Sequence, residues 1–289
     1  MAVTDFIDFS SVPQSPEMAK TAPHLYNYRR VYRDSGDSPT RKPATEETLR
    51  DYLAMYERLG ARHVVVKGKD LETTFGYRVT NEDVAAFCKK HGPRYIGFAG
   101  VDPHKGMTAL RELEYAVKEL GLRGLNIQGF ENRIDIDDPR MYPLYAKCIE
   151  LDIPLNLHTS VNFSIDTAMD HGQPKKLDTV MVHFPELRVC ASPPGFPWVH
   201  ELIAVAWRHP NVSIGLVAVR PKVLGIENSG YGGLLQYGNT VLQDRLIFGS
   251  SYPALPVDRC LEEIEALPLK DGVKRKWVHD NAARFLGLK

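Results

Sequence analysis

The stretch Ile153–His158 (IPLNLH) shows the pattern on which the fold prediction rests. It is a short, mostly apolar run that ends at a polar histidine. A segment with helical periodicity, Pro139–Leu151, precedes it, and another, Lys175–Phe184, follows it. Short apolar runs between helical segments are typical of strands buried on both faces, as in a parallel sheet covered by helices. The repeating unit is therefore a strand followed by a helix.

The same unit recurs on both sides of this stretch. The other predicted strands are Val3–Ser10, His63–Lys67, Tyr95–Val101, Leu122–Ile127, Leu187–Ser192, Val212–Val217 and Arg245–Ser250. The other predicted helices are Glu46–Leu59, Glu82–His91 with Asn81 as its N-cap, Thr108–Leu120, Trp198–His209, Gly233–Leu242, Val257–Leu267 and Asp271–Leu286. Eight strand–helix units in 289 residues predict a single-domain (β/α)8 TIM barrel over residues 1–289. A doubly wound sheet is less favoured, because no glycine-rich phosphate turn follows an early strand.

Composition excludes several classes of partner. The chain has 36 basic and 36 acidic side chains, so it lacks the basic excess that nucleic acid or an acidic membrane requires. No run approaches the roughly 18 apolar residues of a membrane span. The four cysteines are far apart with no CxxC, and the N-terminal sequence lacks a secretory pattern. We therefore expect a cytoplasmic protein with reduced thiols.

One predicted connection is unusually long. Residues 11–45 join the first strand to the first helix and contain several prolines, tyrosines and arginines. A loop of this length inside a compact domain is usually functional or packed against a partner. In a barrel it emerges at the C-terminal face, where active sites lie. We expect either a lid or anion-binding element over that face, or a subunit contact.

Polar residues stand where the predicted strands end, which is where a barrel places its site. They are Ser10, Lys67, Lys69, Asp102, Asn126, Gln128, His158, Ser192, Arg220, Ser250 and Ser251. A catalytic metal needs three or four converging His, Asp, Glu or Cys ligands. His158 is the single histidine in this set, so it cannot hold a metal by itself.

Six segments, in order along the chain, carry a resemblance to a known family. They are GFAGVDP (97–103), IPLNLHTS (153–160), FPELRV (184–189), FPW (196–198) with HPNV (209–212), FGSSYP (248–253) and NAARFLGL (281–288). The chain resembles the amidohydrolase-related family that includes aminocarboxymuconate-semialdehyde decarboxylase and resorcylate decarboxylases. The resemblance covers nearly everything from about residue 80, together with the first strand, and it implies a distorted TIM barrel.

The resemblance also implies a metal site, which this chain has largely lost. Where the family has His-x-His at the end of the first strand, Ser10 and Val12 stand here. The histidine that closes the fifth strand is kept as His158, but Pro193 replaces the next histidine and Ser251 replaces the aspartate. Serine is a poor zinc ligand, and valine and proline cannot ligate through their side chains. We therefore predict a barrel with no metal and no other cofactor.

Without a metal, the remaining polar side chains must supply any chemistry. We expect His158 to act as general acid or base, and Ser10 and Ser251 to orient a substrate or serve as nucleophiles. Lys67 and Arg220 are candidates to bind a carboxylate or to stabilise developing negative charge. Asn126 and His171 complete the predicted substrate-binding set. The predicted pocket is net positive, which points to a small anionic ligand.

Three functions remain open from the sequence. The first is a metal-independent lyase acting on a small aromatic or unsaturated carboxylate, with decarboxylation favoured because the relatives implied by the resemblance decarboxylate such acids. The second is a metal-independent hydrolase of a lactone or a C–C bond. The third is a catalytically silent subunit in a homo- or hetero-oligomer with an active homologue. The polar lining of the pocket favours a working site over a decayed one.

Overall fold

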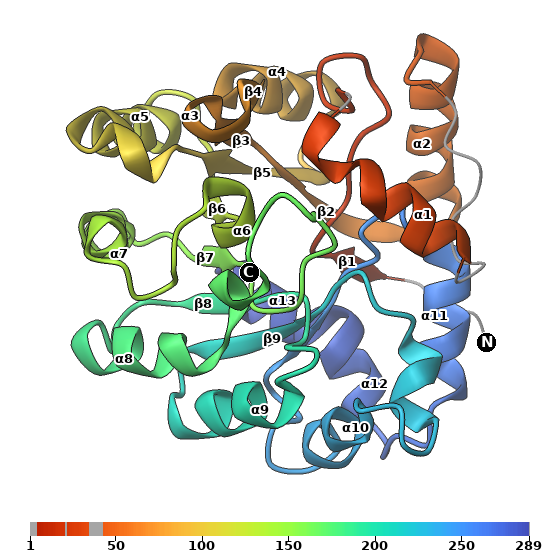
Figure 1. Ribbon diagram of the computed structural model, residues 1–289. Coiled ribbons are helices and arrows are strands. Elements are labelled where there is room, and N and C mark those ends of the chain that lie inside the picture. The colour runs from red at the N-terminus through yellow and green to blue at the C-terminus, as the bar shows by residue number, and fades with distance from the viewer. Residues whose placement is uncertain (1–4, 21, 35–42, 289) are drawn as a thin grey trace.

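Short parallel strands form a ring at the centre of the molecule, with helices outside it (Figure 1). The computed structural model describes residues 5–20, 22–34 and 43–288. Within these residues the order around the eight-stranded sheet is β1, β2, β5, β6, β7, β8, β9, β10. The strands are β1 (Phe6–Asp8), β2 (Ala61–Lys67), β5 (Tyr95–Gly100), β6 (Leu125–Ile127), β7 (Leu155–Leu157), β8 (Val189–Ala191), β9 (Val212–Leu216) and β10 (Leu246–Phe248). Neighbouring strands pair in parallel, so the predicted TIM barrel is confirmed.

The ring closes between its last strand and its first. The backbone N–H of Phe9 donates to the carbonyl of Phe248 at 3.0 Å, and the N–H of Ser251 donates to the carbonyl of Ser10 at 2.7 Å. The N–H of Val12 donates to the carbonyl of Tyr252 at 2.9 Å. These bonds pair the backbones that leave β1 and β10, so the seam of the barrel is closed at its C-terminal face.

The described residues also form helices, most of which lie between successive strands and cover the outside of the ring (Figure 1). They are α1 (Tyr26–Asp34), α2 (Glu46–Arg58), α3 (Glu72–Phe75), α4 (Asn81–His91), α5 (Met107–Lys118), α6 (Gly129–Asn132), α7 (Tyr142–Glu150), α8 (Lys175–His183), α9 (Val199–Arg208), α10 (Gly232–Gly238), α11 (Val257–Ala266), α12 (Val273–Arg275) and α13 (Asn281–Phe285). A π-helical segment, Lys276–Asp280, joins the last two, so the continuous final helix expected from sequence is interrupted.

The N-cap prediction for α4 is wrong by one residue. Thr80 caps the helix, because its side chain accepts a hydrogen bond from the N–H of Asp83. Asn81 lies inside the helix and is buried. Its amide accepts from the N–H of Gly100 at 2.9 Å and donates to the carbonyl of the same residue at 3.2 Å. Asn81 therefore ties the helix to the end of β5.

Residues of β1 alternate between two separate apolar layers. Phe6 of β1 packs outward against the helices, whereas Ile7 and Phe9 face the barrel interior. The ring of Phe9 meets those of Phe98 and Phe285 edge to face, with centroids 5.6 Å apart in both pairs. Because Phe285 belongs to α13, this helix fills the N-terminal end of the barrel and leaves the opposite end for polar groups.

Part of the long connection 11–45 is helical. The sequence predicted a loop here, but a 3₁₀ turn at Pro23–Leu25 leads into α1. Asn27 donates to the carbonyl of Phe163 at 2.8 Å, and the ring of Tyr28 stacks near that of Phe130. These contacts place α1 against the loops that follow β6 and β7, in front of the barrel in Figure 1. Residues 21 and 35–42 of this connection lie outside the described part of the chain.

A small hairpin after β2 was not predicted. Strands β3 (Lys69–Leu71) and β4 (Tyr77–Val79) pair antiparallel, with α3 between them. The buried carboxylate of Asp70 binds Lys105 at 2.6 Å and Arg78 at 3.4 Å. Three-residue strands carry too few residues for an alternation pattern to be detected, which is why the sequence did not show them.

The described residues contain neither a membrane-spanning helix nor a disulfide. In the described ranges no helix has the length and apolar character needed to cross a bilayer. The four cysteines, Cys88, Cys148, Cys190 and Cys260, are free thiols.

Candidate active site

Most of the predicted site residues meet at the C-terminal face of the barrel. Lys67 ends β2 and Asn126 lies in β6, while His158 follows β7 directly. Ser10 and Ser251 follow β1 and β10. Parallel strands end at one edge of their sheet, so these side chains surround a common mouth.

Lys67 is a cation inside the barrel without a carboxylate beside it. Its Nζ lies 4.8 Å from the centroid of the Phe9 ring, and its side chain is partly accessible. Desolvation lowers the pKa of the amine to about 8, while Cys190 and Asp8 oppose this shift. Among the described residues the amine makes no ion pair or hydrogen bond. Asp102 does not pair with it, because its two oxygens accept from backbone N–H groups.

His158 is buried and uncharged at neutral pH. Desolvation lowers its pKa to about 3, with Glu131 opposing the shift and Lys69 adding to it. Its ring packs at a tilt on Phe130, with centroids 4.6 Å apart. Within the described ranges its Nδ1 is buried and has no hydrogen-bond partner. Because its pKa is lowered, the imidazole is a weak base, and its unpartnered Nδ1 is better suited to a hydrogen bond with a ligand than to proton transfer.

Asn126 belongs to a chain of hydrogen bonds across three strands. Its Nδ2 donates to the carbonyl of Gly68 at 3.0 Å, and its Oδ1 accepts from Nδ2 of Asn156 at 2.8 Å. Ser192 Oγ donates to Oδ1 of Asn156 at 2.7 Å, and Gln128 Nε2 donates to Oδ1 of Asn126 at 3.1 Å. This series of hydrogen bonds lines the barrel interior with polar groups at β6, at β7 and after β8. Asn156 was missed, although a lone asparagine between two leucines of a buried strand is a visible signal.

The two predicted serines lie on the barrel seam. Ser251 has a positive φ of 59°, and its N–H is the one that pairs with Ser10. A nucleophilic serine needs a hydrogen bond to a base, and neither serine has one to His158 in the described structure. The neighbouring Ser250 is bonded more firmly, because its Oγ donates to Oδ2 of the buried Asp8 at 2.6 Å. The positions of Ser10 and Ser251 fit substrate orientation better than nucleophilic attack.

Asp8 anchors this seam. Its carboxylate accepts from Tyr56 Oη at 2.7 Å and from the N–H groups of Ser250 and Ser10 at 2.9 and 3.1 Å. Burial raises the pKa of this carboxyl, and these donors oppose the shift. Asp8 points away from the mouth towards α2, so it stabilises the barrel rather than lining the site.

Arg220 and His171 are engaged by other groups. The guanidinium of Arg220 forms an ion pair with Glu263 of α11. Nδ1 of His171 bonds to Asp135, whose other oxygen binds Lys176 at 2.9 Å. Each of these side chains would have to leave a carboxylate before it could bind a substrate.

A buried charged cluster beside the mouth was not predicted as a unit. Oε1 of Glu131 accepts from Lys69 Nζ at 2.8 Å and from His24 Nε2 at 2.9 Å. Its Oε2 is buried and has no partner in the described ranges. Burial alone raises the pKa of Glu131, but Lys69 and His24 outweigh it and the net pKa is lowered. Glu131 lies four residues after β6, so a search extended past the strand ends would have found it.

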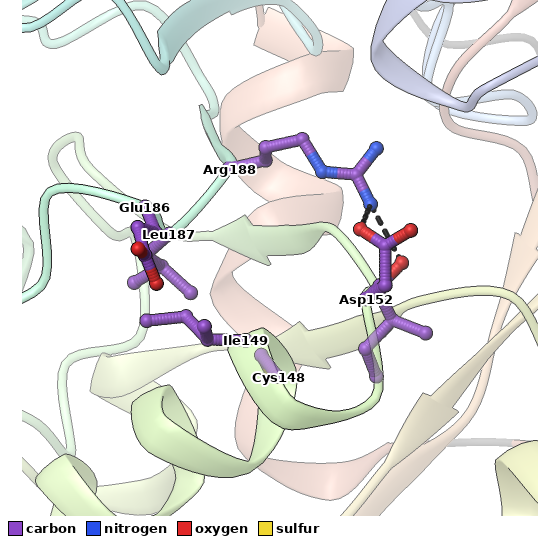
Figure 2. Close-up of a pocket in the computed structure, with 7 residues that line it drawn as sticks. Cys148, Ile149, Asp152, Glu186, Leu187 and Arg188 are labelled. Carbon is purple, nitrogen blue, oxygen red and sulfur yellow. Dashed lines mark hydrogen bonds and ion pairs between the residues drawn. The ribbon is translucent and has the colours of Figure 1, made fainter.

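A surface hollow lies at the other end of the barrel (Figure 2). It has a volume of about 250 Å³ and is lined by Cys148, Ile149, Asp152, Ile153, Glu186, Leu187 and Arg188. Arg188 donates to the carbonyl and carboxylate of Asp152 at 2.6 and 2.8 Å (Figure 2). These residues precede β7 and β8, so the hollow lies at the N-terminal face. None of the candidate site residues lines it.

The residues present do not fit the metal that the family resemblance implies. Nowhere in the described ranges do three or more His, Cys, Asp or Glu side chains converge on a common point. Val12 is partly exposed and offers a hydrocarbon side chain, and Pro193 has no side-chain donor. His158 is thus the single strong metal ligand among the five positions where the family has its metal site, which are Ser10, Val12, His158, Pro193 and Ser251. No step of the proposed chemistry therefore uses a metal.

A closed eight-stranded barrel with a polar mouth at its C-terminal face defines a TIM-barrel protein of the enzyme type. The amidohydrolase family profile matches residues 39–288, and the chain belongs to this family. The expected family is therefore confirmed.

Named relatives and solved structures agree with this assignment. The chain is 30% identical over 254 residues to the gamma-resorcylate decarboxylase of Rhodococcus jostii (strain RHA1), covering 73% of this chain and 76% of the relative. An uncharacterised TIM-barrel protein from Bordetella bronchiseptica superposes with a TM-score of 0.80 and 27% identity, covering 98% of both chains. The dihydroxybenzoic acid decarboxylase of Polaromonas sp. JS666 superposes with a TM-score of 0.67 and 16% identity, covering 99% of this chain and 97% of that one. That structure was solved with manganese and 2-nitroresorcinol. This last likeness shows a shared fold. The expected enzyme class, a lyase, is the class of the named relatives.

Proposed function

We propose that this protein is a carboxy-lyase that works without a metal on a small aromatic or unsaturated carboxylate bound at the barrel mouth. The unpaired amine of Lys67 is the observation that carries the proposal. Its position inside the barrel supplies a positive charge where the donor set for a metal is missing. The decarboxylases among the relatives support the choice of lyase chemistry.

Loss of CO2 leaves an electron pair on carbon, so the site must stabilise negative charge. A protonated Lys67 attracts the substrate carboxylate and then the developing charge. The low polarity around Phe9 strengthens that attraction and weakens the hydration of the carboxylate. The chain of Asn126, Asn156 and Ser192 offers fixed dipoles along the opposite strands. Neutral His158 hydrogen-bonds a phenol or enol of the substrate through its unpartnered Nδ1 and so orients it.

The test is CO2 release from 2,6-dihydroxybenzoate and 2,3-dihydroxybenzoate, before and after treatment with a chelator, with metal analysis of the same sample. We expect turnover that the chelator leaves unchanged and metal well below one equivalent per chain. Stoichiometric manganese or zinc that is required for turnover would overturn metal independence. Hydrolysis of a lactone without CO2 release would replace the lyase by a hydrolase. Binding without any turnover would favour the silent subunit.

Two further expectations stay predictions. A homo- or hetero-oligomer with an amidohydrolase-fold subunit is checked by sedimentation of the purified protein. A cytoplasmic location is checked by fractionation of the source cells.

A further inference from the structure

We propose that Lys67 is a nucleophile that forms an imine with the carbonyl group of an oxo acid bound at the barrel mouth. This deepens the proposed function, on which it depends for the loss of CO2. It names the substrate class as acids with a ketone or aldehyde carbon β to the carboxylate, including the keto tautomers of 2-hydroxybenzoates.

The surroundings of Lys67 are those of a reactive amine rather than a structural ion pair. A structural lysine pairs with a carboxylate, as the neighbouring Lys69 does with Glu131 at 2.8 Å. Lys67 instead lies over the face of Phe9, beside a barrel core that contains Phe98 and Cys190. Lys67 as a whole is partly buried, and it stands at the C-terminal end of β2, where the mouth lies.

The charged and titratable groups that act on Lys67 leave the amine partly neutral. Desolvation is the largest influence, and Lys69 adds to it, while the Cys190 thiol and Asp8 oppose it. Asp8 is bonded to Ser250 and Tyr56 and does not reach the amine as an ion-pair partner. The lowered pKa of Lys67 gives it roughly three hundredfold more free amine at neutral pH than an ordinary lysine has. Desolvation of a lysine in an apolar pocket is an established way to make it nucleophilic.

The chemistry balances without any added cofactor. The neutral amine adds to the carbonyl carbon, and the resulting carbinolamine takes up a proton from solvent and loses water to give an iminium ion. Electrons from the C–COO⁻ bond move towards the iminium nitrogen as CO2 leaves, which forms an enamine. A proton from solvent adds to carbon, and water then hydrolyses the iminium, which releases the ketone or aldehyde, restores the neutral Lys67 amine and returns one proton to solvent. The iminium keeps the positive charge that the site needs for its anionic substrate.

The experiment traps the imine by reduction. The purified protein is incubated with 2-hydroxybenzaldehyde, which has a carbonyl but no carboxylate, and with acetoacetate, which has both. Each sample is reduced with cyanoborohydride, and the modified lysine is located by peptide mass spectrometry. We expect about tenfold or more modification at Lys67 than at any other lysine. Lys67→Met and Lys67→Arg should abolish this adduct, and the matched control Lys69→Arg should keep it.

The outcomes separate this inference from the proposed function. An adduct at Lys67 from 2-hydroxybenzaldehyde supports the imine even if no carboxylate is turned over. Turnover of a dihydroxybenzoate with no adduct at Lys67 from either probe would overturn the imine and leave the carboxy-lyase intact. Equal modification of Lys67 and exposed lysines would also overturn it. The adduct is mapped on the native protein, which carries no substitution. The result therefore does not depend on whether the Lys67 variants fold.

Discussion

Nε2 of His24 lies 2.9 Å from Oε1 of Glu131, and this hydrogen bond joins the segment before α1 to the turn after β6. Both side chains are buried, and the His24 ring stacks on Phe75 with centroids 4.1 Å apart. Lys69 approaches the same oxygen from the hairpin strand β3. One carboxylate thus holds three segments together at the rim of the mouth.

Replacing Glu131 by Gln should destabilise the fold. The change leaves the Lys69 charge without its counter-ion, and breaking a buried pair costs about 3 kcal/mol. The folded pKa of Glu131 is lowered, so its contribution is complete above its ordinary value of 4.5 and is lost as the pH falls below that. Denaturant unfolding at pH 7 and pH 4 measures both effects. The exposed pair of Glu114 and Lys118 is the control, and Glu114→Gln should show no comparable loss. Equal stabilities for Glu131→Gln and the native chain would contradict this role.

His158→Gln should reduce turnover while leaving the fold intact. Glutamine keeps a polar side chain in the pocket but does not place a nitrogen where Nδ1 of His158 lies, and loss of one hydrogen bond to the substrate costs about 10-fold in rate. With its pKa near 3, His158 should also produce no inflection between pH 5 and pH 7 in the rate profile. Steady-state kinetics across that range check both points. His183→Gln, at the end of α8, is the control. An inflection near pH 6.5 that disappears in His158→Gln would show that the imidazole is not desolvated.

The contact with the face of the Phe9 ring should raise the pKa of the Lys67 amine. A cation over an aromatic ring gains about 1 kcal/mol, which corresponds to about 0.7 of a pKa unit. In Phe9→Leu the midpoint for cyanoborohydride trapping at Lys67 should therefore move downward from about 8. Phe98→Leu is the matched control, because that ring also packs on Phe9 in the barrel core. If both variants moved the midpoint equally, the effect would come from general packing and not from the ring face.

Gly172 should tolerate no side chain. A Cβ built there would lie 2.3 Å from the carbonyl oxygen of Ser160 and 3.0 Å from Nδ1 of His158. Gly172→Ala must therefore displace backbone, and we expect a loss of about 1–3 kcal/mol together with lower turnover. Gly232, whose Cβ would meet nothing within 4 Å, supplies the control variant Gly232→Ala. Thermal unfolding of both proteins gives the comparison, and equal melting temperatures would show that the loop after β7 yields easily.

Most of the fold could be predicted from local sequence patterns. Each predicted strand of the barrel is present, because buried strands need apolar residues and helices need apolar periodicity, and both are visible without tertiary contacts. Seven of the eight observed strands are shorter than predicted, as in β7, which covers Leu155–Leu157 within the predicted Ile153–His158, whereas β2 begins two residues earlier than predicted. The bounds of a strand depend on its pairing with both neighbours, and hydrogen bonding between strands is not encoded in one strand alone. The positions of Lys67, Asn126 and His158 at the mouth follow from the same argument, since strand ends converge in any parallel barrel.

What only the tertiary structure decided is which side chains are already neutralised. From sequence, Lys67, Lys69 and Arg220 were equivalent cations at strand ends. In the folded chain Glu131 neutralises Lys69 and Glu263 neutralises Arg220, whereas Lys67 lies over Phe9 without a carboxylate. These partners come from residues 62, 43 and 58 positions away along the chain, respectively. Burial and charge pairing set the pKa of an amine or imidazole, and both depend on such distant neighbours. The sequence by itself therefore determined the barrel and its mouth, and folding determined which of its polar groups is free to react.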